Sequence, residues 1–327
     1  MSKPSDRPAL PSPPVEKSGW PWISADRVST PPGEWPRITI VTPSLNQGKY
    51  LEATIRSVLL QGYPNLEYFV MDGGSQDGSL EILQRYGPWL DYWVSEPDAG
   101  HPNAVNKGLK RATGSLLGFL NSDDFLLPGA LEKIGRAHTL DREKLIAGDV
   151  IDFRDATGEQ HRIGQSGLKF RTFVEVWRQD EWHQPGIFFP RTLLDKIGLF
   201  DETLHLGFDY DFFCRALQYA DVAQLNEPVA MFRLHEQSKT VSNEILIVRE
   251  HLQISRRYWH LIPGVDVRGY RRFAAQRMFC AGVSRLRHRR PRAARLIWEG
   301  FASHPGWALI SAVRQFPGWL RRRATRS

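Results

Sequence analysis

Acidic residues directly after apolar runs are the features of this sequence best suited to chemistry. Residues 115–120, an apolar run, lead into Asn121, Ser122, Asp123 and Asp124. Two adjacent carboxylates repel each other, and a divalent cation held between them and a diphosphate offsets that repulsion. Carboxylate oxygens are hard ligands, so they favour Mg²⁺ or Mn²⁺ over zinc. Because Asp is also common in turns, the position of the pair after a strand carries this interpretation.

A second acidic loop follows the apolar run of residues 66–71. It reads Asp72-Gly-Gly-Ser-Gln-Asp-Gly-Ser79. Its glycines permit positive φ and close approach of a ligand, and Asp72 can accept a hydrogen bond from a base N–H. Asp77 and Ser79 are better explained as the start of the next helix, where a carboxylate caps free backbone N–H groups. Asp72 is therefore the candidate binding residue of this loop.

Residues 95–108 join an acid-rich loop to the start of a helix. Asp98 lies in the loop, and Asn106 and Lys107 lie further along, inside the helix. The N-terminus of a helix carries partial positive charge and free N–H groups, which suit an anionic diphosphate. A capped surface helix with a solvated lysine explains the same residues, and is the better interpretation if the segment is taken alone.

Asp209 stands at the beginning of another helical segment, within Leu206-Gly-Phe-Asp-Tyr-Asp-Phe-Phe213. A carboxylate there can be a helix cap and nothing more. It can also be a general base that removes a proton from an attacking hydroxyl. The local sequence leaves both interpretations open.

Strand-like runs alternate with helical periodicity through the segment that holds most of these acids. The predicted strands are residues 37–43, 66–71, 92–95, 116–120 and 145–153, and the predicted helices are residues 48–61, 79–86, 103–112 and 128–140. This alternation predicts an α/β fold with a mainly parallel, twisted sheet and helices on both faces. Ligands of such sheets bind at the carboxyl ends of the strands, where the acidic loops stand.

Composition favours a globular protein in a reducing compartment. The chain of 327 residues is 41% hydrophobic and has two cysteines, Cys214 and Cys280, which are far apart. This spacing supports neither a disulfide framework nor a zinc site. No uninterrupted apolar run of about 18 residues occurs, and Pro and Ser stand where a signal peptide needs an apolar core. We therefore expect a cytoplasmic protein that is neither exported by that route nor membrane-spanning.

Charge and proline content divide the chain into three predicted regions. Residues 1–36 contain nine prolines and are expected to be a mostly disordered lead-in. Residues 37–240 form the predicted α/β domain, and residues 241–327 an Arg-rich helical tail. Residues 245–327 hold 18 Arg, no Lys and three acids, a net charge of +15 that leaves −8 for residues 1–244.

The tail allows two interpretations that the sequence leaves open. Arginines interleaved with apolar residues such as Trp298, Phe301 and Trp307 suit a helix lying on an anionic membrane surface, at the inner face of the cell membrane. The same pattern suits helices that pack on the preceding domain. No nucleic-acid motif accompanies the charge, so we expect no nucleic-acid partner.

Taken together, the motifs resemble the family 2 glycosyltransferases of the GT-A fold. The strings that carry the resemblance are Ile40-Val-Thr-Pro-Ser-Leu-Asn46, Asp72-Gly-Gly-Ser-Gln-Asp-Gly-Ser79, Ser95-Glu-Pro-Asp-Ala-Gly100 with Ala104-Val-Asn-Lys-Gly108, Asn121-Ser-Asp-Asp124, His183-Gln-Pro-Gly186 and Phe208-Asp-Tyr-Asp211. Each motif alone is weak, but their order on a strand-helix frame is specific. The resemblance covers roughly residues 37–240.

The resemblance implies a role for each candidate residue. The nucleotide-sugar-binding residues would be Thr42, Asp72, Asp98, Asn106, Lys107 and Asp123, with Thr42 and Asp72 at the base. Asp123 and Asp124 would bind ribose and metal, and His235 would match a late histidine that reaches the metal or diphosphate. Asp209 would be the catalytic base. Three positions depart from many relatives: Gly73 and Phe208 stand where acids are common, and Asn121 where Asp is common.

The implied activity is metal-dependent transfer of a sugar, with inversion, from a nucleotide-diphosphate donor to an acceptor hydroxyl. UDP-activated hexoses are the leading donors, and surface or extracellular polysaccharide synthesis is the leading pathway. The acceptor would be a glycan or a lipid-linked molecule, and residues 155–182 would determine acceptor specificity. The alternative is a non-catalytic sugar-nucleotide-binding or scaffold protein with the same fold, which would not need Asp209.

Overall fold

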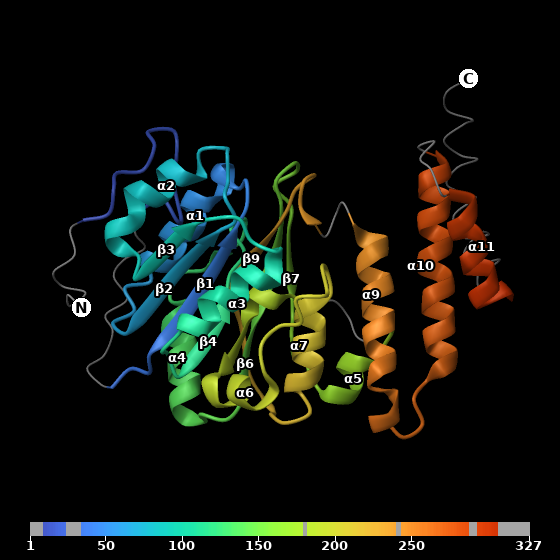
Figure 1. Cartoon of the computed structure of the whole chain (residues 1–327). Coiled ribbons are helices and arrows are strands. Elements are labelled where there is room, and N and C mark those ends of the chain that lie inside the picture. Colours follow the sequence, from blue (N-terminus) through green and yellow to red (C-terminus); the bar gives the residue numbers. More distant parts are fainter. Residues whose placement is uncertain (1–8, 24–33, 179–181, 240–242, 288–292, 307–327) are drawn as a thin grey trace. The chain divides into compact units, whose positions relative to one another are not determined.

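The computed structural model describes residues 9–23, 34–178, 182–239, 243–287 and 293–306 (Figure 1). The chain divides into two compact units. Unit 1 comprises Met1–Phe170 and Asp180–Val241, and unit 2 comprises Arg171–Gln179 and Ser242–Ser327. Unit 2 therefore combines the segment Arg171–Gln179, which interrupts unit 1 in the sequence, with the C-terminal helices.

A single sheet forms the centre of unit 1. Within the described residues its strands are β1 (Ile38–Ser44), β2 (Leu66–Asp72), β3 (Tyr92–Ser95), β4 (Leu116–Phe119), β5 (Phe125–Leu126), β6 (Leu145–Arg154), β7 (Gln160–Ile163), β8 (Ile187–Pro190) and β9 (Val222–Leu234). Their order is β3-β2-β1-β4-β8-β6-β9-β5, and β7 pairs with β6.

The sheet is parallel in its first half and mixed in its second. β1 pairs in parallel with β2 and β4, and β2 with β3. β8 is antiparallel to both β4 and β6, whereas β6 and β9 are parallel. The parallel strands come from the strand-helix units visible in the sequence. The long path from β4 to β8 contains β5, β6 and β7, and such a path can return a strand in either direction.

Helices cover both faces of the sheet, as the sequence predicts (Figure 1). The described helices before unit 2's main segment are α1 (Gly48–Leu59), α2 (Ser79–Tyr86), η2 (Gly87–Trp89), α3 (His101–Arg111), α4 (Ala130–Leu140), α5 (Phe170–Val174), η3 (Gln184–Gly186), α6 (Arg191–Ile197) and α7 (Phe208–Ala216). Unit 2 has α9 (Glu244–Arg257), η4 (Trp259–Leu261), α10 (Val267–Arg287) and α11 (Ala293–Ser303).

Alternation along β1 explains the two layers. Ile38 and Ile40 share a buried core with Ile55 of α1 and Ile134 of α4. Val41 points to the other face, because successive side chains of a strand alternate. There a Cβ on Gly108 of α3 would lie 2.4 Å from a methyl carbon of Val41, so only glycine allows this close packing.

The proline-rich lead-in differs from the prediction of disorder where the structure describes it. The buried Arg56 of α1 donates hydrogen bonds to the carbonyl oxygens of Pro11, Pro21 and Trp22, and Trp20 Nε1 donates to the Leu126 carbonyl oxygen at 2.7 Å. A buried guanidinium needs several acceptors, and the lead-in carbonyls supply them. Residues 9–23 are thus part of unit 1, while residues 1–8 and 24–33 lie outside the described residues.

Unit 2 has a small core of its own. Val248 and Leu252 of α9 pack with Met278 of α10 and Leu296 of α11. Buried Glu175 receives the guanidinium groups of Arg171 and Arg178, at 3.4 and 3.0 Å. The predicted tail therefore contains the helices α9, α10 and α11 in its described residues, with a shared apolar core, while Trp298 is 72% exposed. Trp307 lies outside the described residues. No described helix is both long and apolar enough to cross a membrane.

Candidate active site

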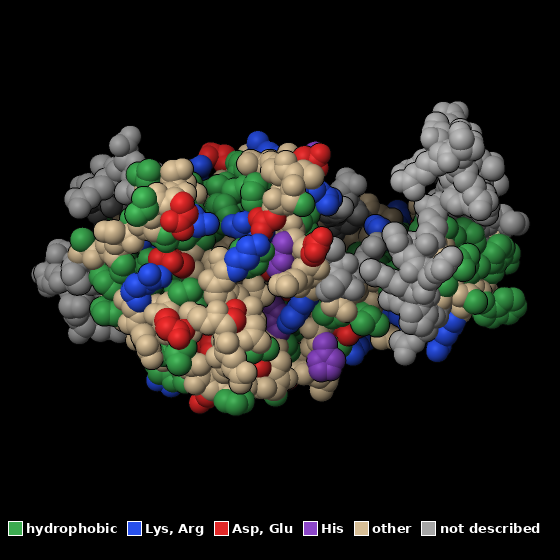
Figure 2. Space-filling view, turned by 90° about the horizontal axis from the view of Figure 1, so that it is seen from above, with side chains coloured by type: hydrophobic (Ala, Val, Ile, Leu, Met, Phe, Trp, Pro, Cys, Tyr) green, Lys and Arg blue, Asp and Glu red, His purple; other side chains and the backbone are tan. Residues whose placement is uncertain are grey.

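The carboxyl ends of β1, β2 and β3 lie side by side. Ser44 is opposite Asp72, and Asp72 is opposite Ser95. Ser95 Oγ donates a hydrogen bond to Asp72 Oδ2 at 2.7 Å. The loops predicted to carry the chemistry therefore meet at one edge of the sheet. Figure 2 shows acidic, basic and histidine side chains gathered near the middle of the face seen from above.

Asp72 organises the loop that follows β2. Its carboxylate accepts hydrogen bonds from the backbone N–H groups of Gly74 and Ser75, at 3.2 and 2.9 Å, and from Ser75 Oγ. Thr42, buried on β1 opposite Val70, has its hydroxyl 3.1 Å from the Tyr68 hydroxyl. Both residues stand where the resemblance expects a nucleotide base. Their contact with a base stays a prediction.

Asp98 explains why glycine follows Asp72. A Cβ on Gly73 would lie 2.6 Å from Asp98 Oδ2, so the Asp98 carboxylate occupies the space that a second acid at position 73 would need. Asp98 Oδ1 accepts a hydrogen bond from the Gly100 N–H at 2.7 Å, just before α3 begins. The acid missing from the loop after β2 is thus replaced in space by one from the loop after β3.

Asn106 and Lys107 of α3 have different surroundings. Asn106 is buried, and its amide bonds to the backbone N–H and carbonyl of Phe200 and to Glu202 Oε1. Lys107 Nζ donates to Glu96 Oε1 at 2.8 Å, next to Asp98. Asn106 therefore fastens residues 200–202 to α3, and Lys107 is paired at the surface. Their predicted contacts with the donor are not needed to explain either position.

Asp123 and Asp124 differ in burial and in partners. Asp124 is 1% exposed and accepts hydrogen bonds from the Arg233 N–H at 2.9 Å and from Asn121 Nδ2 at 3.2 Å. Burial, and then the charge of Asp123, raise the pKa of Asp124 well above its ordinary value. Asp123 is partly exposed, and its Oδ2 lies 3.1 Å from His235 Nε2. The amide at position 121 donates to Asp124, which a carboxylate could not do unless it carried a proton.

His235 and Arg233 come to the Asp pair from the end of β9. The His235 ring packs on Tyr50 of α1 with ring centroids 4.6 Å apart. Arg233 Nε donates to the Asp123 carbonyl oxygen at 3.0 Å, and its Nη1 donates to Asp155 Oδ1 at 2.5 Å. The guanidinium also lies 5.0 Å from the Tyr50 ring centroid. The paired and stacked Arg233 side chain therefore holds the backbone at Asp123, and the backbone N–H of the same residue holds the Asp124 carboxylate.

His101, the first residue of α3, packs against the helix that carries Asp209. Its ring centroid is 4.8 Å from that of Phe208, while Nδ1 is 3.4 Å from Lys239 Nζ. Burial, together with the charge of Lys239, lowers the pKa of His101 to about 3, and Asn121 acts in the opposite direction as a hydrogen-bond partner. His101 is therefore a neutral imidazole at physiological pH.

Asp209 lies in the first turn of α7 and is partly buried. Its Oδ1 accepts a hydrogen bond from the Tyr210 N–H at 2.7 Å. Tyr210 is the next residue in the chain, so this contact lies within the first turn of α7. Phe208, where relatives often carry another acid, packs against His101, so an apolar residue here supports the start of α3.

Comparison with known proteins assigns the family. The family model described as Glycosyl transferase family 2 matches residues 39–205, half of the chain. The chain belongs to this family. An uncharacterised glycosyltransferase of Rickettsia typhi is 29% identical over 213 residues, which are 63% of this chain and 66% of that protein. A putative teichuronic acid biosynthesis glycosyltransferase of Bacillus subtilis, TuaG, is 39% identical over 102 residues, 30% of this chain and 40% of TuaG.

Solved structures share the fold of this glycosyltransferase. Residues 1–349 of Staphylococcus aureus TarS, in complex with UDP-GlcNAc, align with a TM-score of 0.57 and 16% identity over 85% of this chain and 92% of that one. A mannosyltransferase of Pyrobaculum calidifontis, in complex with GDP-Man and Mn²⁺, aligns with a TM-score of 0.53 and 18% identity over 88% of this chain and 89% of that one. The predicted GT-A fold class is confirmed.

The His183-Gln-Pro-Gly186 motif contacts β6 through a His-Asp pair, in which Asp152 is the residue that the sequence did not single out. His183 Nε2 lies 2.7 Å from Asp152 Oδ1, and the His183 ring stacks on Phe232 at 4.4 Å. Trp182, at the end of the predicted specificity segment, packs on Tyr210 and Phe213 of α7. This segment therefore reaches the helix of Asp209.

The sequence predicted most of the residues that meet at this edge of the sheet, but not all of them. It missed Tyr50, His101, Asp155, Arg233 and Lys239. A signal existed for Arg233 and Lys239, because both flank His235 closely in the sequence. No signal existed for Asp155, since its contact with Arg233 depends on the pairing of β6 with β9.

Proposed function

We propose that this glycosyltransferase moves a sugar, with inversion, from a nucleotide-diphosphate donor to an acceptor hydroxyl. The carrying observation is the contact of Asp123 with His235 at the carboxyl edge, beside Asp124, with Asp209 in the first turn of α7 as the candidate base. On one side of such a site the acids hold a cation that stabilises the departing diphosphate, and on the other side a base removes the proton of the acceptor hydroxyl.

The residues present fit a hard divalent cation. Asp123 and His235 lie 3.1 Å apart, and the pKa of Asp124 is raised first by burial and then by the neighbouring charge of Asp123, which a bound cation would offset. Among the described residues, no three His, Cys, Asp or Glu side chains are grouped into a complete metal site. Mg²⁺ and Mn²⁺ suit such a partial set, since water and substrate phosphates commonly complete their coordination.

Each part of the site has a task in the transfer. When bound, Mg²⁺ or Mn²⁺ supplies positive charge to the departing diphosphate. Asp209 accepts the proton of the acceptor hydroxyl as its oxygen attacks the anomeric carbon, so the bond to the diphosphate breaks on the opposite face. Asp72 and Thr42 hold the base, and Asp98 binds on the nucleotide side.

The donor and pathway are proposed from the relatives. TarS is described in complex with UDP-GlcNAc, and TuaG is named for teichuronic acid synthesis. Both agree with a UDP-activated hexose donor and with synthesis of a surface polysaccharide. The acceptor is then a growing glycan or a lipid-linked precursor, met on the cytoplasmic side of the cell membrane.

The test is a panel of nucleotide sugars, with and without Mn²⁺, measured by donor hydrolysis and by thermal stabilisation. We expect one UDP-hexose to stabilise the protein and to be hydrolysed slowly in the presence of metal. Stabilisation without hydrolysis, and without transfer to any glycan offered, would favour the non-catalytic alternative. A protein that responds to no nucleotide sugar would refute both.

A further inference from the structure

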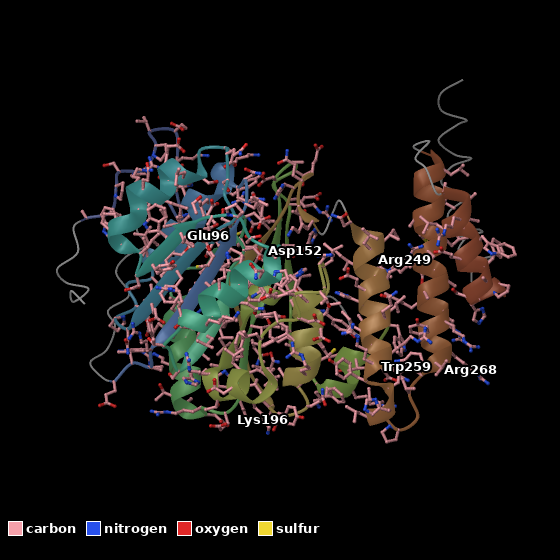
Figure 3. All side chains as sticks on the ribbon, viewed as in Figure 1. Glu96, Asp152, Lys196, Arg249, Trp259 and Arg268 are labelled. Atoms are coloured by element: carbon pink, nitrogen blue, oxygen red, sulfur yellow. The ribbon has the colours of Figure 1, made fainter. Side chains whose placement is uncertain are left out.

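The segment before the helix of Asp209 is bonded to a second helix, α3. It comprises residues 198–207, between α6 and α7, and Lys196, labelled in Figure 3, marks the end of α6. Asn106 of α3 is 1% exposed, and its Oδ1 accepts a hydrogen bond from the Phe200 N–H at 3.0 Å. Its Nδ2 donates to the Phe200 carbonyl oxygen at 2.9 Å. One buried amide therefore holds both backbone polar groups of Phe200.

Glu202 makes a second attachment between this segment and α3. Its Oε1 accepts a hydrogen bond from Asn106 Nδ2 at 2.8 Å, and its Oε2 accepts one from Asn103 Nδ2, also at 2.8 Å. The bonds from Asn106 and Asn103 lower the pKa of Glu202, so the side chain is a carboxylate at physiological pH. Hydrogen bonds to an ionised acceptor are stronger than those between neutral groups. Both N–H groups of the Asn106 amide are thus used within the protein.

The ring of Phe200 packs on α7. It stacks on Phe212 with ring centroids 4.2 Å apart and meets Phe208 edge-on at 5.5 Å. Aromatic pairs at such separations contribute beyond the area that they bury. Phe208 and Phe212 lie on either side of Asp209 in the sequence. Phe200 therefore connects the two helices, because its backbone is bonded to α3 and its ring is packed on α7.

Arg215 of α7 binds the start of the same segment. Its Nη1 and Nη2 donate to the carbonyl oxygens of Ile197 and Leu199, at 2.7 and 3.0 Å. Its Nε donates to Asp211 Oδ2 at 2.9 Å, which fixes the guanidinium on α7. The segment is thus attached to α7 by Arg215 and by the Phe200 ring, so a displacement of the segment also displaces α7.

The position of α7 determines the position of the proposed base. Asp209 lies in the first turn of α7, and a general base acts only within hydrogen-bond reach of the proton that it removes. A misplacement of about 1 Å in a reacting group can cost about 100-fold in rate. Bonds that tie α3 to the segment before α7 therefore bear on the rate of proton transfer.

We propose that Asn106 and Glu202 are positioning residues, which hold α7 against α3 and so place Asp209 for proton transfer. This inference rests on the proposed function, since it assigns a task in the same reaction. It gives Asn106 a role other than the donor contact that the resemblance implies. Loss of these bonds should lower kcat and leave the binding of the nucleotide unchanged.

The experiment exchanges the two side chains. Asn106→Asp removes both N–H donors and places a second carboxylate against Glu202. Asn106→Asp combined with Glu202→Gln restores the hydrogen bond between the two positions in the reverse direction, because the new amide donates to the new carboxylate. Asn65→Asp and Glu227→Gln are the matched controls, since both residues are exposed and belong to other segments of unit 1.

Three quantities are measured for each variant. The first is kcat for hydrolysis of the UDP-hexose selected in the panel, in which water stands in for the acceptor hydroxyl. The second is the Kd of UDP with Mn²⁺, by calorimetry. The third is hydrogen exchange over residues 198–212, by mass spectrometry, which reports on the attachment of the segment without any need for activity.

We expect Asn106→Asp to lower kcat by about 10-fold or more, to speed exchange over residues 198–212 and to leave the Kd of UDP unchanged. The double variant should recover most of the lost kcat, which a general folding defect would not allow. The controls should match the unsubstituted protein.

Unchanged kcat in Asn106→Asp would overturn the proposal and leave the glycosyltransferase assignment in place. Weaker UDP binding with unchanged exchange would also overturn it, and would assign Asn106 to the donor. An unsubstituted protein that neither binds UDP nor hydrolyses a UDP-hexose would instead remove the proposed function, and this inference with it. Thermal unfolding identifies a folding defect in Asn106→Asp, and Glu202→Ala, which leaves the bonds of Asn106 with Phe200, then repeats the comparison.

Discussion

The two units use charged residues in different ways. In unit 1, acids and bases from distant parts of the chain converge on one edge of a sheet, where Asp123 meets His235 and the Arg233 guanidinium meets Asp155. In unit 2, charges pair within and between helices, as Glu299 does with Arg249 and Arg295. Convergence at the strand ends brings reactive side chains close together. Ion pairing along helices leaves many arginines exposed, where they suit helix packing or contact with an anionic surface.

The strongest test of the convergence in unit 1 is removal of its acids. Asp123→Ala and Asp124→Ala should each reduce turnover by about 10³-fold or more, because charge stabilisation of a leaving group by a metal contributes several kcal/mol. Steady-state transfer from the donor identified in the panel measures this. Asp195→Ala, an exposed acid of α6, is the control and should have no effect. Full activity of either variant, or full activity of the unsubstituted protein in excess chelator, would mean that transfer does not need a metal at these acids.

Asp209 tests whether the helix start is a cap or a base. Asp209→Asn keeps the shape of the side chain and removes its basicity, so the fold and donor binding should persist while turnover falls by at least about 10²-fold. Rates are compared with thermal unfolding of the same variant. Turnover near the unsubstituted rate would leave Asp209 as a cap, and loss of the fold would give the residue a structural role.

Substitution of Arg233 tests whether its contacts with the Asp pair contribute to metal binding. Groups that orient metal ligands commonly change metal affinity by about 10- to 100-fold when they are removed. Arg233→Met should therefore weaken Mn²⁺ binding by about 10-fold, measured by calorimetry. Arg136→Met, on the exposed side of α4 beside Glu132, is the matched control. Unchanged Mn²⁺ affinity in Arg233→Met would show that the Asp pair keeps its arrangement without the arginine.

The smallest expected effect concerns the charged surface of unit 2. Each basic residue near an anionic membrane contributes about 1 kcal/mol, so Arg268→Ser with Arg271→Ser should reduce binding to anionic vesicles by a modest factor at low salt. Both side chains are exposed. Co-sedimentation with anionic and neutral vesicles at low and high salt measures it. If the full chain does not bind anionic vesicles at low salt, the helices of unit 2 have a packing role and the membrane interpretation is wrong.

The sequence predicted the strand-helix frame well because local periodicity determined it, but β9 escaped prediction. Pro228 interrupts its pattern, and Asn226 has a φ of 51°. The structure keeps the strand through an irregularity in its register with β6 near Asp149. Pairing with β6, and not local propensity, therefore forms β9.

The same reason explains which site residues were foreseen. Asp72 ends β2, and Asp98, Asp123 and Asp124 lie in the loops after β3 and β4; the strand order alone brings these positions together. The sequence placed His101 at the start of a helix and predicted nothing more for it, because its contacts with Phe208 and Lys239 join residues more than 100 positions apart. Contacts of that kind depend on how α3, α7 and the end of β9 meet.

The central claim is that the carboxyl edge of unit 1 binds the diphosphate of a nucleotide sugar through a divalent metal at Asp123 and His235. The most direct measurement is calorimetric titration of the nucleotide diphosphate into the protein with Mn²⁺ and again with excess chelator, repeated for Asp123→Ala. We predict binding with Mn²⁺ that is lost in chelator and in the variant. Equal affinity with and without metal, or full affinity in Asp123→Ala, would contradict the claim.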